Sequence, residues 1–166
     1  MLRPLIALTF LATSAPAFAQ ASLQPAEPAE IASAVATCVA AARPGSVDSG
    51  VLTGQGWAKG EAADQDGKAI ELPFDVYARK GAKVMITARN ADGNGMCSVV
   101  ARIDRMETAP RVADALSTQF KVKPFQADKE GILWFADRRI VQLAATGDRS
   151  KPGVRVSVMQ QVEKAK

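Results

Sequence analysis

Apolar residues recur at helical spacing in two segments of the chain. The first segment begins at Glu30 and ends before Pro44 and Gly45, which break the pattern. The second begins at Thr108, which we expect to cap the helix, and must end before Pro124. The apolar side chains that repeat along one face are Ile31, Val35, Cys38 and Ala42 in the first segment and Val112, Leu116 and Phe120 in the second. The sequence therefore predicts two amphipathic helices, each with one buried face.

Alternation of apolar and polar residues, typical of half-buried strands, predicts three strands between the two helices and three after the second. Pro73 indicates that the first of these strands lies at a sheet edge or bends there. The residues expected to face the core from the first three strands are Ile70, Leu72, Phe74 and Val76, then Val84, Ile86 and Ala88, then Cys97, Val99, Ala101 and Ile103. The later strands are expected over 132–136, 140–145 and 154–158, with Asp137-Arg138 as the turn between the first two.

The resulting order α-β-β-β-α-β-β-β predicts an α+β fold, in which helices cover one face of an antiparallel sheet. Its two α-β-β-β portions could be two similar halves, although they share little sequence. A hairpin is expected over 83–103, because a turn-forming sequence, NADGNG, separates two alternating runs. Residues 45–68 show little periodicity, and there we expect glycines to form turns while Trp57 folds over the edge of the core.

The beginning of the chain contains the three parts of a secretory signal peptide. Arg3 provides the positive charge, residues 5–11 form a short apolar segment, and Ala17-Phe18-Ala19 is an A-x-A cleavage site. The apolar segment is much shorter than the roughly 20 residues that a bilayer-spanning helix needs, and no later segment is long and apolar enough. We therefore expect a periplasmic or secreted protein with no transmembrane segment after signal cleavage.

This assignment divides the chain into four parts. We expect a signal peptide over 1–19, a proline-containing flexible leader over 20–29, a single α+β domain over 30–160 and a frayed tail over 161–166. Removal of the signal peptide leaves 166 − 19 = 147 residues, which is enough for one domain with its own core.

The chain contains only two cysteines, Cys38 in the first predicted helix and Cys97 in a central predicted strand. An exported chain folds in an oxidising compartment, which favours a disulfide between them. Such a bond would close a segment of 97 − 38 = 59 positions and would constrain the unfolded chain by about 4 kcal/mol. Two buried free thiols or a redox-active pair are the alternatives, and the absence of a C-x-x-C motif disfavours the second.

The charge balance is weakly basic, with 21 lysines and arginines against 17 acids. Loss of Arg3 with the signal peptide reduces the net charge from +4 to 20 − 17 = +3. A charge of this size mildly favours anionic partners, but it is not the signature of a protein that binds nucleic acid. We therefore expect no nucleic-acid partner.

Histidine is absent from the sequence, which removes the commonest general base and the commonest metal ligand near neutral pH. Serine–histidine and cysteine–histidine pairs are excluded, and no S-x-x-K motif is present. Two carboxylates could still hydrolyse a glycosidic bond if they faced each other across a cleft. The clustered acids, which we expect to be solvated instead, are Asp64, Asp66, Asp104, Glu107, Asp114, Asp128 and Glu130. No enzymatic activity and no cofactor are predicted.

Two short motifs are similar to ligand-binding loops but lack essential parts. Gly54-Gln55-Gly56 with Gly60 does not have the G-x-G-x-x-G spacing, and we expect neither a strand before it nor a helix after it. Residues 90–95 match the start of a calcium loop, but the first position is asparagine and the twelfth is Ala101 instead of glutamate. Neither a nucleotide site nor a metal site is therefore predicted.

The sharpest candidate site is a group of arginines at the junction between the mid-chain strand and the second helix. Arg102, Arg105 and Arg111 bracket this junction, and the N-terminus of the helix would add free backbone amides. Guanidinium groups are well suited to binding carboxylates and phosphates. These three residues form the predicted anion-binding site, with a solvated and partly salt-bridged surface as the alternative.

The arrangement of Cys38 in an early helix, Gly56-Trp57 after it and Cys97 in a mid-chain strand resembles that of small exported (periplasmic) proteins of Gram-negative bacteria. The resemblance supports export and the disulfide, and it assigns no catalytic residue. The function we expect is a non-enzymatic periplasmic or secreted module that binds a protein or an anionic envelope component. The alternatives are a carboxylate-based hydrolase acting on a cell-wall polymer and a structural accessory subunit of an envelope complex.

Overall fold

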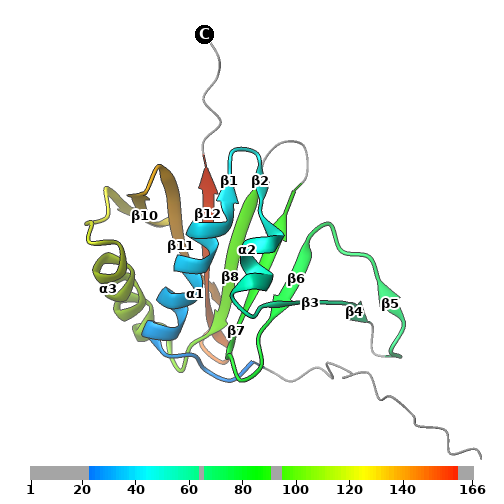
Figure 1. Ribbon diagram of the computed structural model, residues 1–166. Coiled ribbons are helices and arrows are strands. Elements are labelled where there is room, and N and C mark those ends of the chain that lie inside the picture. The colour runs from blue at the N-terminus through cyan, green and yellow to red at the C-terminus, as the bar shows by residue number, and fades with distance from the viewer. Residues whose placement is uncertain (1–22, 64–65, 91–94, 161–166) are drawn as a thin grey trace, which may run out of the picture.

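A computed structural model describes residues 23–63, 66–90 and 95–160. These residues form a mixed α/β domain in which one large antiparallel sheet carries its helices on a single face (Figure 1). The predicted signal peptide, residues 91–94 of the predicted turn and the predicted tail over 161–166 lie outside the described residues. Within the described ranges, the helices are too short or too polar to cross a membrane.

The large sheet consists of eight strands, each antiparallel to its neighbours. Its order is β3 (Ala58–Gly60), β6 (Asp75–Ala78), β7 (Val84–Arg89), β8 (Met96–Arg102), β12 (Pro152–Gln160), β11 (Arg139–Gly147), β10 (Gly131–Ala136) and β9 (Gln126–Asp128). The first four and the last four of these strands form two meanders, which meet where β8 pairs with β12. Each meander follows a helix in the chain, and the idea that the two halves are similar stays a prediction.

Two helices, α1 (Pro28–Ala41) and α3 (Ala109–Phe120), cover the core face of the sheet and contact each other (Figure 1). α1 lies against β7, β8 and β12, while α3 lies against β10. The side chains that β8 and β12 bury most completely beneath α1 include Cys97, Val99, Val156 and Val158, all with no exposed surface. Removal of these apolar side chains from water is the main force that holds the helices on the sheet.

The hairpin predicted over 83–103 is confirmed. Each predicted inward residue of β7 and β8 faces the core, in the register Val84↔Ala101, Ile86↔Val99 and Ala88↔Cys97. The turn at Asp137-Arg138 is also confirmed. Both residues have left-handed backbone angles, with φ of 48° and 63°, as a two-residue hairpin turn requires.

The apolar residues predicted to face the core from the first strand are exposed instead. The exposed fraction is 45% for Ile70, 38% for Leu72 and 37% for Phe74. β5 (Ala69–Ile70) pairs with β4 (Ala62–Ala63) in a separate two-stranded sheet, which projects from the β3–β6 end of the domain (Figure 1). The prediction of a core-facing strand over 70–76 is therefore wrong.

Proline and the phase of the alternation explain this difference. Pro73 has no backbone N–H to donate, so a ladder of hydrogen bonds cannot run through it, and β6 begins only at Asp75. Within β6, Tyr77 faces the core with 2% of its surface exposed, whereas Val76 faces away. The core-facing positions are thus one residue out of phase with the predicted set.

Several short elements escaped prediction because none is long enough to show a periodic pattern. They are β1 (Ala42–Arg43), β2 (Ser46–Val47), α2 (Ser49–Gly54), β3, β4 and β9. The predicted order α-β-β-β-α-β-β-β is therefore incomplete, since each meander has four strands in the large sheet. Trp57, which follows α2, is buried at 1% exposure, and the guanidinium of Arg79 lies 4.7 Å from the centre of its ring.

α1 begins two residues earlier than predicted. Pro28 occupies the first turn, where the missing N–H costs no helical hydrogen bond. Just before it, the backbone N–H of Ala26 donates to the carbonyl oxygen of Arg102 over 2.8 Å, and Ala26 is buried. This end of the predicted flexible leader is therefore held against β8.

The start of the second helix also differs from the prediction. Thr108 belongs to a short 3-10 turn (Met106–Thr108) and has helical backbone angles, so it does not cap α3 with its side chain. Its hydroxyl instead donates to the carboxylate of Asp104. Asp104 therefore organises the junction between β8 and α3.

Candidate functional site

The helices in the described part of the chain lie on one face of the large sheet, which leaves the opposite face without a helix (Figure 1). Successive side chains of a strand point to opposite faces, so each strand contributes to both. Val99 has no exposed surface beneath α1, whereas Val100 is partly exposed on the other side of the same strand. We call this other surface the open face. Its side chains from β6 to β10 are Val76, Ala78, Met85, Thr87, Arg89, Met96, Ser98, Val100, Arg102, Leu133, Phe135, Ile140, Gln142, Ala144, Thr146, Arg155, Ser157 and Met159.

An apolar row crosses four strands of the open face. The pairings Met96↔Met159, Met159↔Ile140 and Ile140↔Phe135 place these four side chains next to one another on β8, β12, β11 and β10. Phe135 is 56% exposed, and the other three are partly exposed. Neighbouring strands lie about 4.8 Å apart, so the three intervals give a row about 14 Å long. A row of this kind offers apolar contact area, and its methionines can adapt their shape to a partner.

From β6 to β10, the charged side chains of the open face are three arginines, and the edge strand β9 adds the carboxylate of Asp128 to the same face. Arg89, Arg102 and Arg155 lie at its positions on β7, β8 and β12, and no open-face position from β6 to β10 carries a carboxylate. Arg89 and Arg155 are exposed, while Arg102 is partly buried. The surface therefore combines apolar contacts with positive charge, which suits a partner that is both apolar and acidic.

A polar row runs through the middle of the open face. Thr87, Ser98, Ser157 and Gln142 lie opposite one another in register on four adjacent strands. The hydroxyl oxygens of Ser98 and Ser157 are 3.0 Å apart and share a hydrogen bond, and the residues are only 2% and 6% exposed. Each hydroxyl thus has a partner in the protein, and no basic side chain in the described part of the chain hydrogen-bonds to either. This pair holds β8 and β12 together and is not arranged as a nucleophile.

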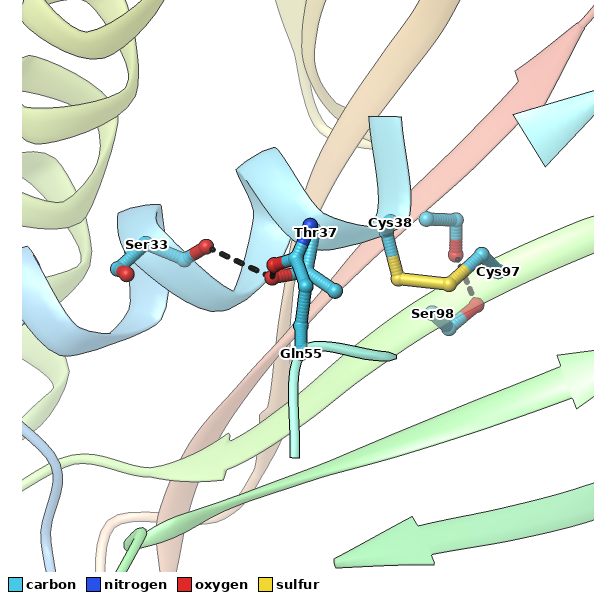
Figure 2. Close-up of a disulfide and its surroundings, with 7 residues drawn as sticks. Ser33, Thr37, Cys38, Gln55, Cys97 and Ser98 are labelled. Atoms are coloured by element: carbon cyan, nitrogen blue, oxygen red, sulfur yellow. Dashed lines mark hydrogen bonds between the residues drawn. A yellow bond between two sulfur atoms is a disulfide. The ribbon is translucent and has the colours of Figure 1, made fainter. Parts of the chain in front are cut away.

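The predicted disulfide between Cys38 and Cys97 is present (Figure 2). Both cysteines are fully buried, with their Cα atoms 5.5 Å apart, so the alternative of two free thiols is excluded. The bond ties α1 to the core side of β8, the strand whose other side carries Met96 and Ser98. It therefore anchors the strand at the centre of the open face to the helix layer behind it.

A hydrogen bond next to the disulfide links the first two helices. The hydroxyl of Thr37 in α1 donates to Oε1 of Gln55, which follows α2, over 2.7 Å (Figure 2). Thr37 is buried at 5% exposure, so this bond satisfies a polar group that would otherwise be costly to bury. The helix layer is thus fixed by one covalent bond and by a buried polar contact.

The three arginines of the predicted anion site have different surroundings. Arg102 lies on the open face, and Arg105 forms an exposed ion pair with Asp104, with 3.3 Å between Nε and Oδ2. Arg111 lines a shallow groove of about 390 Å³ together with Glu27 and Asp114, whose negative charges oppose anion binding. The geometry supports only Arg102 as part of a larger cationic surface.

The acids with altered acidity lie in loops or at the end of an edge strand. Hydrogen bonds from Thr108, Gln126 and Ser150 lower the pKa of Asp104, Asp128 and Asp148, respectively. A glycosidase acid needs a raised pKa to hold its proton near neutral pH. These three carboxylates are therefore suited to holding loops and not to donating protons.

The incomplete calcium motif has a structural use in its described part. Oδ1 of Asn90 accepts a hydrogen bond of 2.7 Å from the backbone N–H of Val47, which belongs to the β1–β2 hairpin. A Cβ atom added to Gly95 would lie 2.2 Å from the backbone nitrogen of Ser46 in the same hairpin. Both residues thus position β1 and β2 over the end of β7 and β8. Asp92 and Asn94 lie outside the described residues.

Sequence reasoning concentrated on the core-facing side of each strand and missed the open face. A usable signal was present, because Met85, Met96 and Met159 all occupy positions that alternate with the apolar core residues.

No family model, curated protein or solved structure matches this chain.

Proposed function

We propose that the protein is a non-enzymatic binding module of the periplasm or of the secreted fraction, and that it binds its partner through the open face. The observation that carries this proposal is the apolar row from Met96 to Phe135, next to Arg89 and on a face that carries three arginines and no carboxylate from β6 to β10. Large exposed apolar side chains grouped on one side of a folded domain are typical of interaction surfaces. The buried disulfide and the signal-like N-terminal sequence support a location outside the cytoplasm.

The chemistry of the open face defines the class of partner. Arg89 and Arg155 would attract a negatively charged group, while Phe135 and Met159 would remove apolar side chains from water. A protein segment with both acidic and apolar side chains satisfies both requirements. The hydrolase alternative lacks a comparable observation, since the carboxyl groups with a shifted pKa have it lowered.

The proposal can be tested with a small probe that has the same two properties. The dye 8-anilinonaphthalene-1-sulfonate is aromatic and carries one negative charge, and its fluorescence rises in apolar sites. We expect it to bind the folded, oxidised protein at low micromolar concentration near neutral pH. Phe135→Ser and Arg155→Gln should each weaken this binding several-fold, because they remove an apolar contact and a positive charge from the open face.

Matched substitutions away from the open face provide the controls. Phe125, which is 60% exposed and precedes β9, and Arg149, in the loop before β12, are exposed residues of the same types outside this surface. Phe125→Ser and Arg149→Gln should therefore leave the dye affinity unchanged. Equal affinity in all four variants would contradict the proposal, provided that their thermal melting shows that each remains folded.

A further inference from the structure

A short arm at the end of the sheet exposes three large apolar side chains. We define the arm as residues 69–74 (AIELPF), which contain β5 and lead into β6. Ile70, Leu72 and Phe74 are each more than one-third exposed. The arm projects away from the helix layer (Figure 1). Such a segment presents a narrow apolar edge to the surroundings.

The apolar row of the open face is long enough to receive several side chains from one short segment. The row from Met96 to Phe135 crosses three strand intervals and covers about 14 Å. Ile70, Leu72 and Phe74 lie within five consecutive residues of the arm. The three apolar side chains of one arm could therefore contact the row together.

The charges of the two surfaces are opposite. Glu71 is exposed within the arm, and Glu61 is exposed just before β4, whereas Arg89 and Arg155 are exposed on the open face. Among residues 61–63 and 66–74, the sequence contains three acids and one lysine. Complementary charge of this kind favours association and sets the orientation of the partners.

We propose that the open face binds the arm of a second copy of this chain. The inference rests on the proposed function, since it names the partner of the open face. A two-fold symmetric pair would contain the arm-to-face contact twice, because each copy supplies both an arm and a face. Each copy would then cover Phe135 and Met159 of the other with Leu72 and Phe74. The paired form would leave little of either apolar surface in contact with water.

Sedimentation velocity of the folded, oxidised protein over a range of concentrations tests this inference. We expect a reversible dimer that weakens at high salt, because the contact between Glu71 and the arginines is screened. Leu72→Ser/Phe74→Ser in the arm and Phe135→Ser on the face should each shift the protein to monomer. The control Phe125→Ser should remain a dimer.

A charge exchange tests the pairing of arm with face directly. Glu71→Arg and Arg155→Glu should each weaken the dimer at least tenfold, because like charges then meet across the contact. Combination of the two substitutions in one chain should recover much of the lost affinity, since every arm-to-face contact regains opposite charges. Failure of the double variant to recover any affinity would overturn the proposed contact.

The dye distinguishes failure of this inference from failure of the proposed function. If the arm covers the face, Leu72→Ser/Phe74→Ser should increase dye binding at high protein concentration. The inference would be overturned if the protein is monomeric at every concentration. It would also be overturned if the arm substitutions leave the dimer affinity unchanged. The proposed function would still stand in that case if Phe135→Ser and Arg155→Gln weaken dye binding. Binding of the monomer to phosphatidylglycerol vesicles through Phe135 would assign the face to lipid and would also overturn the inference.

Discussion

Ser98 and Ser157 face each other across the strand pair that joins the two meanders, with their hydroxyl oxygens 3.0 Å apart. Both residues are almost fully buried although they lie on the open face, because the larger side chains of neighbouring strands surround them. Each hydroxyl thus satisfies the other at the centre of the sheet.

The serine pair predicts a specific pattern of stability in a double-mutant cycle. Ser157→Ala leaves the hydroxyl of Ser98 without its partner and should lower the free energy of unfolding by about 1–3 kcal/mol. Ser98→Ala/Ser157→Ala should cost less than the sum of the two single variants, because no hydroxyl remains unsatisfied. Urea unfolding of the four proteins measures both quantities, and strict additivity would show that the hydroxyls do not interact.

The Cys38–Cys97 bond should contribute strongly to stability. It closes 59 positions of chain, so Cys38→Ala/Cys97→Ala should lower the free energy of unfolding by about 4 kcal/mol relative to the oxidised protein. Because both sulfurs are buried, the oxidised native protein should also resist alkylation until it is unfolded and reduced. Equal urea midpoints for the oxidised protein and the double variant would contradict this prediction.

Gly95 should tolerate no side chain. A Cβ at this position would lie 2.2–2.3 Å from three backbone atoms of Ser46. Gly95→Ala must therefore displace the β1–β2 hairpin. We expect a loss of about 3 kcal/mol or more. Gly54→Ala is the matched control, since nothing lies within 4 Å of its Cβ, and it should be neutral or stabilising by up to about 1 kcal/mol. Thermal melting compares the two variants.

The junction between β8 and α3 should depend on pH. The hydrogen bond from Thr108 lowers the pKa of Asp104 below its ordinary value of 3.8. A lowered pKa means that the carboxylate stabilises the fold above the unfolded value, and that this contribution disappears as the pH falls through the folded value. Thr108→Val should therefore destabilise the protein more at pH 6 than at pH 2.

NMR titration provides the direct measurement for this junction. The pKa of Asp104 should rise toward 3.8 in Thr108→Val, because the largest cause of its lowering has been removed. The control is Thr118→Val, whose hydroxyl donates to the carbonyl oxygen of Asp114 in its own helix. It should leave the pKa of Asp104 unchanged, and a similar rise in both variants would indicate a nonspecific change.

Long segments with a clear period could be predicted from sequence. The alternation through Val84–Ala88 and Cys97–Ala101 fixes which residues face the helices, because slipping the pairing by one residue would turn every buried side chain toward water. The disulfide was predictable for a different reason, since only two cysteines were available and one lay on each apolar face.

The arm at 69–74 shows where the pattern fails. Its alternating apolar residues are those of a buried strand, but Pro73 interrupts the ladder and leaves Ile70 and Leu72 exposed. The open face escaped prediction because it combines side chains of the 83–103 hairpin with those of β12, a strand that is distant in sequence. Only the pairing of β8 with β12 brings Met96 next to Met159, and a contact between residues so far apart has no local signal.

The position of β12 has a consequence for how the protein matures. This strand is the last one in the described part of the chain, yet it occupies the middle of the sheet between β8 and β11. If the chain is exported N-terminus first, as proposed, it cannot complete its core until β12 has crossed the membrane. Until β12 arrives, β8 is an unpaired edge strand of the first meander. A chaperone that covers this edge would therefore be needed until the end of translocation.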